Sequence, residues 1–228
     1  MQIIIKGGLH TKNSPKNTKD SVLLALESSR VDGVLLNVQM TKDNKLVVAI
    51  DNRLYHCSIS ENNYIDLMKY NLGSKVKKHT VILLEEVLKL YQNSSQKLIL
   101  EISLCNNPKE LVEQLAFLLN QYQPVNSYIT TPLKEIVIYA QNSLKNSKVG
   151  ASILNQNSDL WNLDLDFYIV NPNSLNTREI AKNVKDQKII MLELMSRRQV
   201  NEILLLNHNL FENQLFWIIN EFTEQQEN

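Results

Sequence analysis

A chain of 228 residues with 43% hydrophobic and 21% charged residues can bury a core of its own, which excludes a disordered or fibrous protein. Its 24 Lys and Arg side chains are balanced by 24 Asp and Glu side chains, so no overall positive field attracts nucleic acid. No apolar run reaches the roughly 18 residues of a membrane span, and the run 2–5 is too short for a signal-peptide core. We therefore expect a single cytoplasmic domain without a membrane span and without nucleic acid as a partner.

Short runs rich in β-branched residues alternate with longer segments of helical periodicity. The runs are mostly continuously apolar, as strands covered on both faces require. Helical spacing of apolar residues appears in 21–29 and again at Leu111, Leu115, Leu118 and Leu119. The alternation predicts parallel strands joined by crossover helices. The predicted strands are 2–6, 33–38, 46–50, 97–103, 127–130, 148–153, 166–170, 188–194 and 215–219.

The segment 41–45, between two extended runs, has the composition of a tight turn. Val38 and Leu46 should therefore flank a small hairpin-like excursion from the sheet. No repeat, linker or low-complexity segment divides the chain, and its length suits one α/β barrel, which commonly has roughly 200–250 residues.

Reactive groups of a parallel barrel project from the carboxyl ends of its strands, so these positions carry the functional information. Several short segments there resemble the motifs of glycerophosphodiester phosphodiesterases. The segment 6–8 (Lys-Gly-Gly) stands in place of His-Arg-Gly, and 15–18 (Pro-Lys-Asn-Thr) resembles Pro-Glu-Asn-Thr. The segment 32–43 resembles Asp-x-Ile-Glu-x-Asp-Val-x-x-Thr-x-Asp, 47–51 resembles Val-Val-x-His-Asp, and 100–103 resembles Ile-Glu-x-Lys. The resemblance covers nearly the whole chain and is weaker in its C-terminal half.

This resemblance implies a single-domain (β/α)8 TIM barrel of the phospholipase C-like phosphodiesterase type. It also implies a link to lipid metabolism. We expect the barrel to occupy 1–222 and a polar C-terminal tail to occupy 223–228. Because function belongs to the site and not to the barrel, the family's activity has to be carried over position by position.

The family uses two histidines as acid and base, an arginine and a lysine against the phosphate, and three carboxylates around a divalent cation. Here Lys6 and Ile50 stand in place of the histidines; an aliphatic side chain cannot transfer a proton, and an unperturbed lysine stays protonated near neutrality. Gly7 replaces the arginine, Leu35 and Asn37 replace two carboxylates, Ser103 replaces the lysine, and Glu101 alone is retained. We expect no catalytic residue, no metal ion and no cofactor.

Lys6, Asn37, Glu101 and Ser103 remain as candidate ligand-binding residues at the barrel mouth. Two roles are open for Lys6: it can bind an anion, or it can neutralise Glu101, which we favour. Leu35 would make the mouth apolar if its side chain points there. His10, His79 and the basic run 75–79 are interpreted as solvated loop residues.

The leading hypothesis is a catalytically inactive member of the family that binds a small anionic ligand or a protein partner. The alternative is an enzyme with a rebuilt, metal-independent site, in which Lys6 and Glu101 act on a phosphodiester or another small phosphorylated substrate. That alternative needs a lysine whose pKa is lowered by burial, whereas a nearby carboxylate raises it.

Overall fold

The parallel strands form a closed ring. The computed structural model describes residues 2–103, 105–155, 158–170, 189–194 and 215–219. Within these ranges β1 pairs with both β2 and β12, and the strand order β1-β12-β11-β10-β9-β8-β7-β2 completes the barrel. The barrel strands are β1 (Gln2–Lys6), β2 (Gly33–Met40), β7 (Lys97–Ile102), β8 (Ser127–Thr131), β9 (Lys148–Ile153), β10 (Phe167–Val170), β11 (Ile189–Leu194) and β12 (Leu215–Ile219). The predicted (β/α)8 barrel is confirmed, and these strands match the predicted runs to within about two residues.

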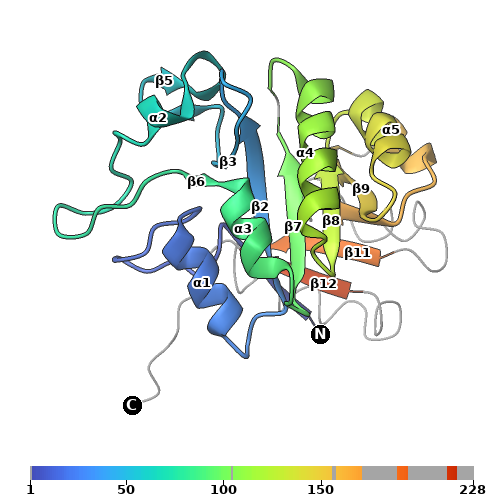
Figure 1. Cartoon of the computed structure of the whole chain (residues 1–228). Coiled ribbons are helices and arrows are strands. Elements are labelled where there is room, and N and C mark those ends of the chain that lie inside the picture. The colour runs from blue at the N-terminus through green and yellow to red at the C-terminus, as the bar shows by residue number, and fades with distance from the viewer. Residues whose placement is uncertain (1, 104, 156–157, 171–188, 195–214, 220–228) are drawn as a thin grey trace.

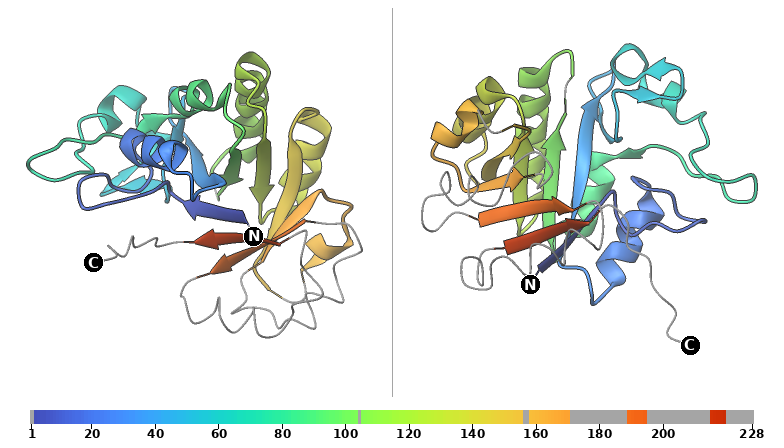
Figure 2. Two further views of the ribbon diagram at one scale, coloured as in Figure 1. Left: turned by 90° about the horizontal axis from the view of Figure 1, so that it is seen from below. Right: turned by 180° about the vertical axis from the view of Figure 1, so that it is seen from behind.

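Helices lie against the outside of part of this ring (Figure 1). They are α1 (Lys19–Glu27), α3 (Leu84–Tyr91), α4 (Pro108–Tyr122) and α5 (Lys134–Ser143), with a short 3-10 turn at Asp159–Asn162. Seen from below, the four helices follow one another around the sheet (Figure 2). The helical segments predicted around 21–29 and 111–119 correspond to α1 and α4.

Two separate apolar cores explain why the strands are apolar on both faces. Successive side chains of a strand point to opposite faces, so Ile4 lies inside the ring while Ile5 faces the helices. The outer core joins the strands to the helices. The inner core fills the barrel with Ile4, Leu35, Ile99, Tyr128, Phe167, Ile169 and Ile218.

The excursion after β2 is confirmed as well. β3 (Leu46–Val48) runs antiparallel to β2, with Val38 opposite Val48 and Met40 opposite Leu46. β6 (Ile82–Leu83) pairs with β3, and between them lie β4 (Arg53–Leu54), β5 (Cys57–Ser58), a 3-10 turn (Ile59–Glu61) and α2 (Tyr64–Leu67). This segment stands at the upper left in Figure 1 and has a small core of its own.

The expected limit of the barrel at 222 and the expected tail, 223–228, lie outside the described residues. In the described part of the chain, no helix is both long enough and apolar enough to cross a membrane.

Candidate functional site

A layer of polar side chains lies directly above the inner core, at the carboxyl ends of the strands. Four of them come two residues after an inner-core side chain, so strand alternation turns them to the same side. Lys6 follows Ile4 on β1, and Glu101 follows Ile99 on β7. We call this set the polar layer; its members are Lys6, Asn37, Glu101, Ser103, Thr130 and Ser152.

The Glu101 carboxylate is the centre of the polar layer. Its Oε2 accepts a hydrogen bond of 2.7 Å from the Asn37 amide, and the Lys6 ammonium lies 3.8 Å from the same oxygen. Its Oε1 accepts a hydrogen bond of 3.1 Å from the Ser152 hydroxyl. The Lys6 and Glu101 side chains are 24% and 16% exposed, so solvent reaches both. One ammonium and one carboxylate leave the layer without net charge.

Hydroxyl groups extend the network to both sides of Glu101. The Asn37 amide also lies 3.0 Å from the Ser103 Oγ. Ser152 and Thr130, both buried, have their hydroxyl oxygens 3.0 Å apart. The structure thus brings together all four residues predicted from the sequence and adds Ser152 and Thr130. Sequence reasoning missed these two because a single hydroxyl on a strand carries no pattern; counting two residues on from Tyr128 would have indicated Thr130.

The apolar replacements have different surroundings. Leu35 is only 1% exposed and packs in the inner core, so it fills the barrel and does not line an open mouth. Ile50, in place of the second histidine, is 50% exposed. Gly7 has a φ of 79°, in the left-handed region that disfavours side chains. Its N–H donates to the carbonyl of Leu35 at 2.8 Å, so this position serves the backbone turn.

A divalent cation of the kind used by the resembled family does not fit this donor set. Ca²⁺ and Mg²⁺ prefer several hard oxygen ligands, commonly with more than one carboxylate. Both Glu101 oxygens already accept hydrogen bonds, and Asn37 presents its amide nitrogen to Glu101. Among the described residues, no group of three or more His, Cys, Asp or Glu side chains could hold a metal ion.

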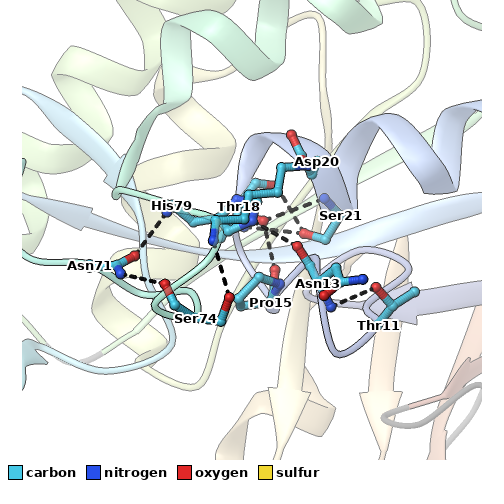
Figure 3. Close-up of polar contacts among 10 residues, drawn as sticks. Thr11, Asn13, Pro15, Thr18, Asp20, Ser21, Asn71, Ser74 and His79 are labelled. Atoms are coloured by element: carbon cyan, nitrogen blue, oxygen red, sulfur yellow. Dashed lines mark hydrogen bonds and ion pairs between the residues drawn. The ribbon is translucent and has the colours of Figure 1, made fainter.

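Two loops beside the mouth are tied together (Figure 3). The His79 Nε2 lies 2.7 Å from the carbonyl oxygen of Asn13, and Lys77 forms an ion pair with Asp20. The Asn71 Oδ1 accepts hydrogen bonds from the backbone N–H groups of Gly73 and His79.

Most of the basic run 75–79 is exposed, but His79 is only 7% exposed, so the expectation that it is solvated is wrong. It joins the loop after β1 to the loop before β6.

No protein-family model matches the chain, and no curated protein matches it. Solved structures are similar over nearly its whole length. A phosphodiesterase from Oleispira antarctica, in complex with the product sn-glycerol-3-phosphate, has a TM-score of 0.80 at 15% identity, covering 96% of this chain and 92% of the other. A glycerophosphodiester phosphodiesterase from Parabacteroides distasonis has a TM-score of 0.80 at 16% identity, with coverage of 96% and 92%.

A glycerophosphodiester phosphodiesterase from Agrobacterium tumefaciens has a TM-score of 0.71 at 15% identity, and 96% of each chain is covered. The TM-scores establish a common fold, whereas identities of 15–16% leave activity to the site itself. The chain therefore has the (β/α)8 barrel fold of the glycerophosphodiester phosphodiesterases.

Proposed function

We propose that this chain is a divergent relative of the glycerophosphodiester phosphodiesterases that has lost hydrolysis and acts in the cytoplasm as a binding or interaction module. The observation that carries the proposal is the state of Glu101. Glu101 is the one carboxylate retained of the three that the resembled family places around its cation; it accepts hydrogen bonds at both oxygens and lies beside Lys6. Both oxygens of Glu101 are therefore already used in hydrogen bonds within the protein. The residues at the histidine positions supply no acid and base pair.

The proposed ligand-binding residues are Lys6, Asn37, Glu101 and Ser103, and the proposed occupant is a small anionic ligand or a protein partner. Lys6 would contact an anion through its ammonium, and Ser103 would offer its hydroxyl. Such an anion competes with Glu101 for Lys6, so we expect weak binding.

Hydrolysis of glycerophosphocholine, with Mg²⁺ or Ca²⁺ supplied, tests the proposal. We expect the wild-type chain and Glu101→Gln to release glycerol phosphate at the same rate as buffer. Glu135→Gln, on the exposed surface of α5, is the matched control. Metal-dependent turnover that Glu101→Gln abolishes and Glu135→Gln preserves would overturn the proposal.

The second candidate is an enzyme in which Lys6 and Glu101 act without a metal, and the adjacency of the two groups favours it. Its base would be a neutral lysine. A carboxylate 3.8 Å away stabilises the charged form of lysine, which opposes that role. Titrating Lys6 by NMR distinguishes the candidates, since a base working at neutral pH must lose its proton near pH 7.

A further inference from the structure

The opposite end of the barrel has an open cleft of about 460 Å³. Its walls are the loops that precede β8 and β9, and Asp166 lies at its edge. Its buried side includes Leu144 and Val149. A cleft of this size matches the range of roughly 300–1,000 Å³ that small-molecule sites occupy. It lies at the amino ends of the strands and shares no residue with the polar layer.

Lys148 places a positive charge in this cleft. It is the first residue of β9, and its Nζ lies 5.2 Å from the ring centroid of Tyr128 and 3.5 Å from the Tyr128 hydroxyl. Tyr128 is 4% exposed and packs edge-to-face against Phe167 in the inner core, so the ring is a fixed platform. An aromatic face attracts the ammonium without neutralising it, which leaves its charge available to an anion.

The charged groups around Lys148 include two further lysines. Lys145 lines the same cleft and is exposed. Lys97, at the start of β7, has its pKa lowered by burial and further by Lys148, against the opposing effect of Asp32. Two ammonium groups and the single carboxylate of Asp166 line the cleft, and one oxygen of Asp166 accepts the Val149 N–H at 2.8 Å. The lining therefore carries a net positive charge.

Neutral donors complete the lining. The hydroxyl oxygens of Ser127 and Ser147 are 2.7 Å apart, and only one of the two protons lies between them. The other hydroxyl can rotate its proton towards a bound group. Phosphate oxygens accept hydrogen bonds from ammonium and hydroxyl groups, and this cleft offers both kinds of donor.

We propose that this cleft binds the phosphate group of a small phosphorylated molecule, with Lys148 and Lys145 as the charged contacts and one hydroxyl of the Ser127–Ser147 pair as a neutral donor. The volume of the cleft exceeds that of a single phosphate ion, so an organic portion fits beside the phosphate. The site is independent of the mouth and of any activity there.

Titrating inorganic phosphate into the full chain at constant ionic strength, followed by backbone amide NMR shifts, tests this site. We expect saturable shifts in 126–128 and 145–149, with chloride at the same ionic strength giving none. Lys148→Met keeps an apolar chain over Tyr128 and should weaken binding at least about tenfold, because a charged hydrogen-bond donor is lost. Lys145→Gln, on the exposed rim, should weaken binding without any effect on folding.

Lys109→Met is the matched control, since the Lys109 ammonium lies 5.9 Å from the Tyr139 ring centroid on the outer surface. It should bind phosphate like the wild type. A small sugar phosphate that binds more tightly than inorganic phosphate would identify an organic ligand, and equal affinity would identify free phosphate. Shifts confined to the mouth, or unchanged affinity in both Lys148→Met and Lys145→Gln, would overturn the proposal.

Discussion

Asn37 shows how one amide changes the chemistry of the mouth. Its NH₂ group donates to Glu101 and lies close to Ser103, whereas a carboxylate at the same position could only accept. Two carboxylates as close as the 2.7 Å between the Asn37 amide nitrogen and the Glu101 Oε2 repel one another unless a cation lies between them. The amide thus stabilises the polar layer without a metal ion.

Asn37→Asp is therefore expected to lower the free energy of unfolding by about 1–3 kcal/mol at pH 7. Repulsion raises the pKa of one carboxyl group of the new pair in the folded state. The loss should be complete above that pKa and should disappear as one carboxyl is protonated on lowering the pH towards about 4. Urea denaturation at several pH values measures both effects. Asn146→Asp, on an exposed loop, is the control, and equal stability of Asn37→Asp and wild type at pH 7 would contradict the argument.

At the scale of elements, the loop before β6 is held against the start of α1. The hydrogen bond from Lys77 lowers the pKa of Asp20, while burial opposes this effect. Asp20 also lies in the first turn of α1, where a negative charge is favoured by the helix dipole. The ion pair and the bond between His79 and Asn13 together fix the position of this loop.

Asp20→Asn should reduce stability by roughly 0.3–1 kcal/mol at pH 7, because the ion pair is partly exposed to solvent. A carboxyl group whose folded-state pKa is depressed contributes stability above its unfolded pKa, and this contribution is lost as the pH falls through the folded value. The difference between variant and wild type should therefore shrink and then vanish as the pH falls through the depressed folded-state pKa of Asp20. Thermal unfolding followed by circular dichroism across this range measures it; a difference that does not change with pH would contradict the ion-pair explanation.

The barrel strands could be predicted from the sequence because burial on both faces makes them continuously apolar. The excursion was predicted only as a hairpin. Its shorter elements, such as α2 and β5, are set by packing around Val47 and Ile59, and segments of two to four residues have no detectable period. For the site, the resemblance of the motifs predicted that Lys6 and Glu101 lie close together. The position of Ser152 next to Glu101 depends on the register between neighbouring strands, which the sequence does not reveal.

At the scale of the whole molecule, the inner core separates the polar layer from the cleft at the other end of the barrel. Leu35 belongs to this core, in place of the carboxylate that the resembled family would have. A barrel interior of this kind is a packed core and not a pore. The two ends of the molecule are therefore chemically separate surfaces.

Leu35→Ala removes packing from the middle of this core. We expect a loss of about 2–5 kcal/mol in the free energy of unfolding, because the closed ring of strands can collapse only partly around the cavity. Leu154, which is 63% exposed, provides the control, and Leu154→Ala should change stability by less than about 0.5 kcal/mol. Chemical denaturation measures both variants. Equal effects would show that Leu35 is not a core residue.

The pairing of β1 with β12 has a consequence for synthesis of the chain. Gln2 pairs with Phe216, so β1 lacks its second neighbour until synthesis has passed Phe216. At roughly 5–20 residues per second, that interval is about 10–40 s. Throughout it, β1 exposes one row of unpaired backbone groups, which can accept a strand from another molecule. The seam of the barrel thus cannot close before β12 is made, and until then the open edge of β1 is a site at which nascent chains can associate.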